Sequence, residues 1–358
     1  MPWRRRSRLA ERLDLEVPVI QAPMAGAQDA ELAIAVSAAG GLGSLPCAML
    51  GADAVRAEAR RIRAATNRAF ALNFFCHEEP AADAGREAAW REALTPYYRE
   101  FGLDDDVPAA PVRRPFGEEQ SALVEELAPP VVSFHFGLPP AGLLARVKAS
   151  GAVVISSATT VAEARWLAAR GVDFIIAQGL EAGGHRGMFL AADAAAQVAT
   201  MALVPLVSDA IDLPVIAAGG IADGRGMAAA LCLGADAVQI GTAFLHAPEA
   251  RISDAHRQAL RAAPAEARVL TNVFTGRPAR GIRNRLVDEQ GPLSPLAPQF
   301  PLAANRVGPL RVAAEQAGSA DFSPLWSGQA GAIGIELPAG ELLRRIAAQA
   351  EALLARPR

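Results

Sequence analysis

The sequence predicts an α/β fold, a (β/α)8 TIM barrel followed by a smaller α-rich second domain. Eight short apolar runs alternate with helix-like segments, and most of the runs end in Gly, Pro, Asn or Asp. Eight strand–helix units are the number that closes a parallel barrel. The first run also lacks the Gly-x-Gly-x-x-Gly turn of an open dinucleotide-binding sheet. After the eighth run, Pro248 to Arg311 loses the alternation and is predicted to be a small second domain or lid.

The predicted strands have the length and the continuous apolar character of buried parallel strands. In chain order they are Val17–Met24, Gly41–Pro46, Phe70–Phe75, Val131–Phe136, Val153–Ser157, Phe174–Gln178, Pro214–Gly219 and Ala237–Phe244. The helices expected between them repeat apolar residues at three- and four-residue spacing, and include Asp29–Ala39, Asp53–Ala65, Thr160–Arg170 and Gly224–Leu233. Asp223 is expected to cap the last of these helices.

The stretch from His77 to Pro130 is longer than a strand–helix connection needs. Helices are expected at Arg86–Phe101 and Gly117–Leu127, on either side of the acidic run Asp104–Asp106. Long insertions at the mouth of a barrel often build or cover its site. The alternative, a solvated decoration of the surface, stays open.

The predicted domain division follows from these interruptions. Residues 1–247 and 316–358 are assigned to the barrel, and residues 248–315 to the small substrate or lid domain. The last segment, Trp326 to Leu354, is expected to be helical and to pack back onto the barrel.

Composition excludes several classes of function. The 358 residues carry a net charge of -3, which argues against a general nucleic-acid surface. The basic opening, Met1 to Arg6, leads into no apolar stretch of a secretory signal, and no apolar run reaches membrane-spanning length. Cys47, Cys76 and Cys232 are too scattered for a disulfide framework, which favours a reducing, cytoplasmic setting.

Polar and glycine residues at the predicted strand ends make up the candidate site, since these ends converge on one mouth in a closed barrel. The loop after the sixth strand, Gln178 to Gly187, contains four glycines and His185. The other strand ends contribute Pro23, Met24, Asn73, His135, Gly219, Gly220, Gln239, Ile240, Gly241 and Thr242.

These residue types suit a nucleotide-like ligand. The glycine turns after strands seven and eight predict a phosphate site, because each is expected to lead into a helix. A single Gly-Gly turn would be explained by turn geometry alone. The Gly183–Gly184 pair lets the backbone approach a flat ligand, or merely supplies positive φ. Asn73 and Gln178 each offer a donor and an acceptor, which suits the edge of a flavin pyrimidine.

The remaining histidines and the cysteine–histidine cluster are weaker candidates. His135 is expected either to contact substrate or to be a hydrogen-bonded structural residue, while His246 and His256 are expected at the surface. The run Cys76-His77-Glu78-Glu79 predicts no metal site, because zinc ligands come in spaced pairs.

The chain resembles the nitronate monooxygenases over nearly its whole length. The segments that carry the resemblance are Gln21–Gly26, Asn73–Phe75, Gln178–Gly187, Ala218–Ile221, Gln239–Thr242, Phe274–Gly281 and Leu325–Gln329. The resemblance implies FMN held by Asn73, Gln178, Gly183, Gly220 and Gln239–Thr242, with His185 as the catalytic histidine. The histidine-bearing form is similar to class I members, which implies oxidative denitrification of alkyl nitronates by O2 to a carbonyl compound and nitrite. Nitroalkanes would first lose their α-proton.

Two other functions stay open at this point. An NAD(P)H-dependent FMN enoyl-acyl-carrier-protein reductase shares the barrel and a similar Glu-Ala-Gly-Gly-His run, although Arg186 and the Pro-rich second domain favour the monooxygenase. A non-redox isomerase would need an acid–base carboxylate pair at the strand ends, which the sequence does not offer there. The expected partners are a small nitronate and O2, with no nucleic acid or membrane, for a monomer or homodimer. Tyr97 and Tyr98 are the only tyrosines, so aromatic substrate contacts are expected from Phe274, Phe300 or the insertion.

Overall fold

The computed structural model describes residues 7–81, 83–104, 114–191 and 193–355. The predicted basic opening, residues 1–6, and the last two aspartates of the acidic run lie outside the described residues. Eight parallel strands form the barrel: β1 (Val19–Gln21), β2 (Gly43–Pro46), β3 (Phe70–Phe75), β4 (Val131–His135), β5 (Val153–Ala158), β6 (Phe174–Gln178), β8 (Val215–Ala218) and β9 (Ala237–Ile240).

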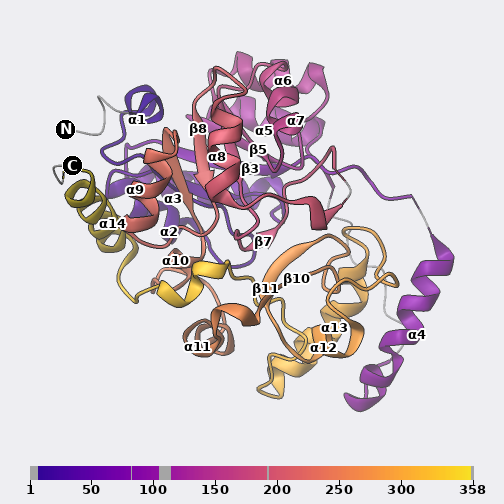
Figure 1. The fold of residues 1–358 in the computed structure, drawn as a ribbon. Coiled ribbons are helices and arrows are strands. Elements are labelled where there is room, and N and C mark those ends of the chain that lie inside the picture. Colours follow the sequence, from indigo (N-terminus) through magenta and orange to yellow (C-terminus); the bar gives the residue numbers. More distant parts are fainter. Residues whose placement is uncertain (1–6, 82, 105–113, 192, 356–358) are drawn as a thin grey trace.

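The strand order confirms the predicted barrel. The sheet runs β1-β9-β8-β6-β5-β4-β3-β2, and a parallel bridge between Ile20 and Leu42 joins its first and last strands. Figure 1 shows the ribbon of the barrel with its helices. The helices around it are α2 (Ala30–Ala38), α3 (Ala52–Ala65), α5 (Glu118–Leu127), α6 (Ala141–Ala149), α7 (Val161–Ala168), α8 (Thr200–Ser208), α9 (Gly224–Cys232) and α14 (Ala339–Leu354). Asp223 caps the start of α9 as predicted, accepting from the amides of Arg225 and Gly226.

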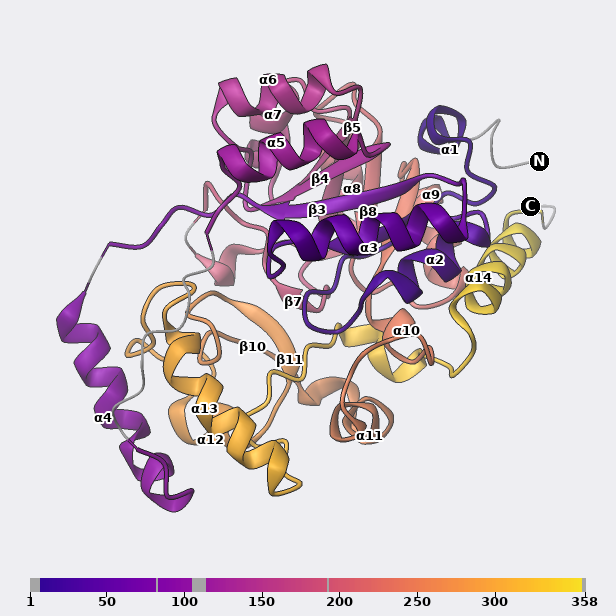
Figure 2. The ribbon, with the colours of Figure 1, turned by 180° about the vertical axis from the view of Figure 1, so that it is seen from behind.

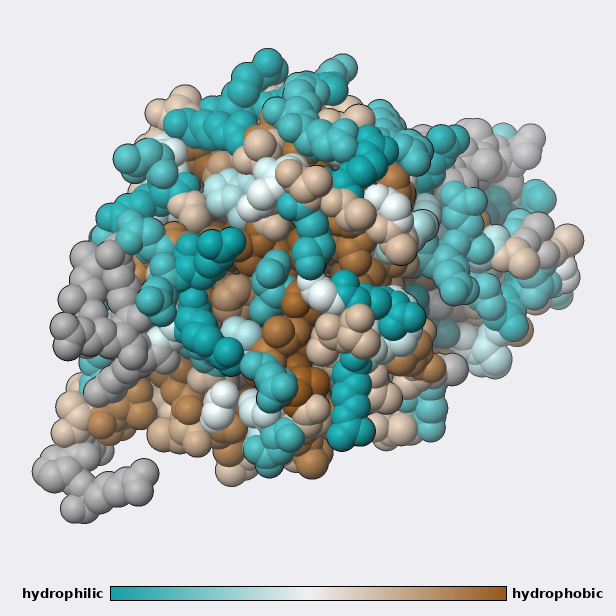
Figure 3. All heavy atoms as spheres, turned by 90° about the horizontal axis from the view of Figure 1, so that it is seen from above, coloured by the Kyte–Doolittle hydropathy of each residue, from teal (hydrophilic) through white to brown (hydrophobic). Residues whose placement is uncertain are grey.

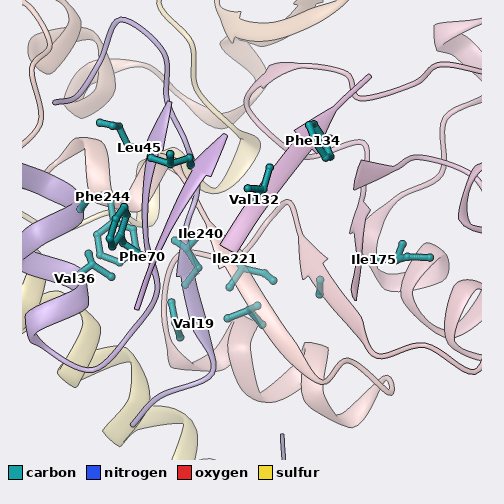
Figure 4. Close-up of a cluster of buried hydrophobic side chains, with 14 of the residues drawn as sticks. Val19, Val36, Leu45, Phe70, Val132, Phe134, Ile175, Ile221, Ile240 and Phe244 are labelled. Atoms are coloured by element: carbon teal, nitrogen blue, oxygen red, sulfur yellow. The ribbon is translucent and has the colours of Figure 1, made fainter. Parts of the chain in front are cut away.

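The apolar core has two layers because successive strand residues point to opposite faces. The inner layer fills the barrel with branched side chains such as Ile155, Ile176 and Ile216. Helix α1 (Arg8–Leu13) adds Leu9 to this layer, and the carboxylate of Asp236 holds its start by accepting from the hydroxyl of Ser7. The outer layer lies between strands and helices (Figure 4), and includes Val19, Val36, Phe70, Ile240 and Phe244.

A small lobe, defined here as residues 84–104 and 248–326, borders the barrel mouth. It contains α4 (Ala84–Glu100), α11 (Asp254–Ala262), η2 (Ala265–Ala267), β10 (Arg268–Thr271), β11 (Ala279–Ile282), α12 (Arg285–Gln290) and α13 (Ala303–Gln316). Strands β10 and β11 form an antiparallel hairpin, and β11 also pairs with β7 (Gly184–His185) from the barrel loop. The loop after β6 therefore doubles as an edge strand of the lobe.

Helix α4, from the long insertion, packs on α13 (Figure 2). Trp90, Leu94 and Tyr98 share one apolar cluster with Leu310 and Phe322. The second helix of the insertion, α5, instead packs between α3 and α6 on the barrel. The boundaries of the two predicted domains stay a prediction, and the contact of α4 with α13 ties part of the insertion to the lobe.

Three local expectations need correction. The eighth strand ends at Ile240, and α10 (Thr242–Leu245) follows it where the strand was expected to continue. The region after Pro248, expected to be α-rich, also contains the β10–β11 hairpin. From Trp326 on, only η3 (Gln329–Ile333) precedes α14, because Gly328, Gly334 and Pro338 interrupt the expected helix. A last short element, η1 (Ala194–Ala196), lies between β7 and α8.

The surface mixes polar and apolar side chains. Figure 3 shows hydrophilic side chains interspersed with apolar areas over one face of the molecule. Among the described residues, no helix is both long enough and apolar enough to cross a membrane.

Candidate active site at the barrel mouth

A cavity of about 280 Å³ lies at the carboxyl ends of the barrel strands, bordered by the small lobe. Most of the predicted site residues line it, and their roles stay predictions: Pro23, Met24, Asn73, His135, Gln178, Gly183, Gly184, His185, Gly219, Gly220, Gln239, Gly241 and Thr242. Ile240 is the exception. Its side chain lies in the outer core layer near Val19 (Figure 4), because its neighbour Gln239 takes the cavity side of the strand.

His185 lies at the junction of the barrel and the small lobe. Its backbone pairs with Ala279 of β11, and its Nε2 lies 2.8 Å from the hydroxyl of Thr275. Three aromatic rings surround its imidazole, with centroids at 6.1, 5.3 and 5.4 Å for Phe136, Phe300 and Trp326. A titratable ring thus lines the cavity in a largely apolar setting.

His135 holds the backbone of His185. Its Nε2 donates to the carbonyl of His185 at 3.2 Å, and Gln178 Nε2 donates to the same oxygen at 3.1 Å. The Nδ1 of His135 therefore accepts from the hydroxyl of Ser157, at 2.9 Å. Burial lowers the pKa of His135 to about 3, so its ring is neutral at physiological pH. With both ring nitrogens used in this way, the geometry favours the structural role over substrate contact.

Arg186 holds the backbone at the end of β6. Its fully buried guanidinium donates to the carbonyls of Gly179 and Gln178 at 2.7 and 2.8 Å, and to the side-chain oxygen of Gln197. Burial lowers its pKa to about 10, which still leaves it charged at neutral pH. Because its hydrogen bonds go to uncharged oxygens, Arg186 stabilises the conformation of the loop.

Glycine is required at two points where backbones cross closely. A Cβ on Gly183 would lie 2.4 Å from the amide nitrogen of Gly328, and one on Gly219 would lie 2.9 Å from the hydroxyl of Thr200. Gly219 also has φ of 113°, which side-chain-bearing residues rarely adopt. These glycines bring main-chain groups to the cavity wall, as expected of a cradle for a flat or phosphorylated ligand.

The expected anion site needs one correction. The first amides of α9 are already used, because Asp223 accepts from Arg225 and Gly226 while the side chain of Gln349 accepts from Gly224. The start of α9 therefore offers little to a phosphate. The turn of Gly219 and Gly220 itself, together with Gly241 and Thr242 at the end of the neighbouring strand β9, remains to provide the amide donors.

The donor set fits a flavin. The side-chain nitrogen of Asn73 donates to the carbonyl and hydroxyl of Ser133 at 3.2 and 2.9 Å, which leaves its oxygen as an acceptor for a ligand N–H. Gln178 is more occupied than expected, because its oxygen also accepts from the amide of Gly187 at 2.7 Å. Main-chain groups for a phosphate, an amide for a heterocycle and the apolar Met24 and Ile176 thus share one cavity.

Two histidines expected at the surface are buried. The Nε2 of His246 donates to the carbonyl of Gly331 at 3.0 Å, and that of His256 to the carbonyl of Trp326 at 3.1 Å. Both hold the segment of residues 325–333 that closes one side of the cavity. The local sequence around the polar helix α11 gives no sign that this distant segment covers it.

Sequence reasoning also missed the contact of Thr275 with His185. The segment Phe274–Gly281 carries part of the family resemblance, but the sequence assigns no role to the hydroxyl of Thr275. His77 is buried, and its ring centroid lies 4.9 Å from that of Phe300, the same ring that packs on His185. Among the described residues, no three His, Cys, Asp or Glu side chains come together as metal ligands would.

Comparisons with known proteins agree on one family. A family model described as nitronate monooxygenase matches residues 6–349. A nitronate monooxygenase of Pseudomonas aeruginosa is 43% identical over 342 residues, covering 95% of this chain and 97% of the relative. One from Paraburkholderia phytofirmans is 41% identical, covering 93% and 92%.

Solved structures show the same fold. A nitroalkane oxidase from Streptomyces ansochromogenes has a TM-score of 0.89 at 38% identity, covering 97% of this chain and 99% of that one. FabK from Thermotoga maritima has a TM-score of 0.73 at 27% identity, covering 98% and 97%.

Proposed function

Because this chain belongs to the nitronate monooxygenase family, whose members are flavin enzymes, we propose that it oxidises alkyl nitronates with FMN and O2. The products would be a carbonyl compound and nitrite. Nitroalkanes would enter the same reaction after loss of the α-proton. The observation that carries the proposal is the placement of His185 on the same cavity as the glycine turns and Asn73.

We assign the residues around the cofactor by their chemistry. Gly219, Gly220, Gly241 and Thr242 would hold the phosphate through main-chain and hydroxyl groups, and Asn73 would accept from the heterocycle. When bound, FMN supplies the electron acceptor and the reaction with O2. The chain itself supplies binding, orientation and the handling of one proton.

His185 is the residue we assign to that proton. A neutral imidazole accepts the α-proton of a nitroalkane, and a protonated one stabilises the negative oxygens of a nitronate. The rings of Phe300 and Trp326 lie beside it, and such apolar surroundings strengthen electrostatic interactions. Both forms of the substrate class are thus compatible with one histidine.

The test begins with the visible spectrum of the purified protein. Anaerobic mixing with an alkyl nitronate is expected to change the flavin absorbance, whereas mixing with NAD(P)H is expected to leave the flavin oxidised. Aerobic turnover should then release nitrite. A colourless protein that FMN does not reconstitute would contradict the proposal.

The reductase alternative is tested by the same mixing. Rapid bleaching of the flavin by NAD(P)H, with no response to nitronate, would favour the reductase. We also propose a cytoplasmic setting, consistent with free thiols at Cys47, Cys76 and Cys232.

A further inference from the structure

The imidazole of His185 meets a hydroxyl that comes from the small lobe. We propose that Thr275 is a positioning residue that orients the ring of His185 for proton transfer. Thr275 is only 5% exposed, its Oγ1 lies 2.8 Å from His185 Nε2, and both residues line the cavity. The catalytic consequence rests on the proposed function, while the orientation of the ring does not.

Thr275 lies in a turn that is itself firmly held. The carbonyl of Asn272 accepts from the amides of Thr275 and Gly276 at 3.3 and 2.7 Å. The side chain of Asn272 is bonded in both directions to the backbone of Ser294, at 2.9 Å each way. Gly276 has φ of 88°, and a Cβ there would lie 1.9 Å from the carbonyl oxygen of Pro298. The hydroxyl therefore has a defined position.

The backbone of His185 is fixed from both sides. Strand β11 pairs with it on the lobe side, while Gln178 and His135 donate to its carbonyl on the barrel side. These contacts leave the side-chain torsions of His185 to be set by its ring neighbours. The aromatic rings restrict where the imidazole can lie, and the hydroxyl of Thr275 contacts one ring nitrogen, Nε2.

A hydroxyl suits this task because it can accept from an N–H or donate to a lone pair. By accepting from Nε2–H, Thr275 selects the neutral tautomer whose Nδ1 can take up a proton, and the same hydrogen bond persists in the imidazolium. The ring therefore keeps its orientation when a proton is transferred to or from the other ring nitrogen, Nδ1. Loss of the hydroxyl would remove this hold on Nε2 without removing the base.

The experiment compares three variants of the FMN-loaded enzyme. Thr275→Val removes the hydroxyl at nearly constant volume, Thr275→Ser keeps it, and Thr271→Val removes another buried hydroxyl from the same hairpin. For a neutral nitroalkane, T275V is expected to lower kcat about 10-fold to 100-fold with KM within about 3-fold, the scale of a misplaced catalytic group. T275S and T271V should retain kcat within about 3-fold, and the flavin content should not change. Wild-type kcat in T275V, or equal loss in T275S, would overturn the proposal.

A second measurement does not depend on turnover. The chain has five histidines, so ¹⁵N-histidine spectra of the loaded enzyme are tractable, with His185→Gln assigning the resonance. The Nε2 signal of His185 should shift in T275V and stay in place in T275S and T271V. If the wild type has no activity on nitroalkanes or nitronates, the proposed function fails, yet this signal still decides the role of Thr275. Should T275V not fold, Thr275→Ala serves in both measurements.

Discussion

The histidines of this chain differ in what their ring nitrogens contact. His135, His246 and His256 each donate to a backbone carbonyl, and burial lowers the pKa of all three. These rings act as neutral connectors between segments. His185 instead contacts the hydroxyl of Thr275 on the cavity wall. It is therefore the histidine that we expect to exchange a proton with substrate.

Replacing His185 with alanine should separate cofactor binding from turnover. We expect H185A to retain FMN, because the glycine turns and Asn73 are unchanged, and to lose about 100-fold or more of kcat on a neutral nitroalkane. Nitrite release and the flavin spectrum measure the two effects. His246→Gln, which keeps a donor for Gly331 and replaces a residue that does not itself line the cavity, is the matched control. Unchanged turnover in H185A would remove this residue from the mechanism.

His256 should make stability depend on pH. Burial lowers its pKa from 6.5 to about 4, so below pH 6.5 the unfolded chain binds a proton that the native state does not. The contribution of neutral His256 to the free energy of unfolding is thus complete above pH 6.5 and is lost as the pH falls toward 4. His256→Gln cannot titrate but can still donate to Trp326. When the pH falls from 7.5 to 5.5, the free energy of unfolding measured with urea should decrease by roughly 1 kcal/mol less in H256Q than in the wild type. Equal losses would contradict this reading.

At the level of elements, the barrel strands were predictable and the lobe sheet was not. Runs such as Phe174–Ala177 are apolar throughout, because both faces of a barrel strand are buried. In contrast, β7 is only Gly184–His185, and β11 carries the buried Arg280. Neither shows the pattern of a strand. The polar strand ends could be predicted to converge, but the contact of Thr275 with His185 depends on the pairing of β7 with β11 and could not.

The crossing of the β6 loop with the segment after Trp326 should control cofactor retention. In Gly183→Ala the new Cβ would lie 2.4 Å from the amide nitrogen of Gly328, so one backbone must move. We expect G183A to bind FMN at least about 10-fold more weakly, as measured by flavin fluorescence on dilution. Gly142→Ala, in an open position on α6, is the control and should bind FMN normally. Equal affinities would show that this crossing does not shape the cofactor site.

At the scale of the whole molecule, the lobe is assembled from distant parts of the chain. Trp90 on α4 is fully buried and its indole donates to the carbonyl of Ala303, at the start of α13. Phe322, which the predicted division assigns to the barrel, packs in the same cluster. Helix α4 was predicted from its periodicity, but no local pattern shows which distant helix it contacts.

This assembly predicts how damage in the insertion should spread. Trp90→Ala would remove a large buried ring, at a cost of about 3–5 kcal/mol within the lobe. Because β11 pairs with β7, loosening the lobe should also loosen the backbone at His185. Hydrogen exchange in W90A should therefore speed up in α4, α13, the β10–β11 hairpin and β7, while α9 and α14 stay protected. Turnover should fall as the amides of β7 lose their protection from hydrogen exchange.

The matched control for W90A is Trp166→Ala on the barrel. Trp166 packs on Phe189 with ring centroids 5.1 Å apart, away from the lobe cluster. Faster exchange in W166A should stay near α7, with the lobe and β7 unchanged. If W90A sped exchange only in α4, the insertion would be a surface decoration. If it sped exchange through α9 and α14 as well, barrel and lobe would unfold as one unit. The predicted pattern, confined to the lobe and β7, would show that the insertion supports the site through the strand that carries His185.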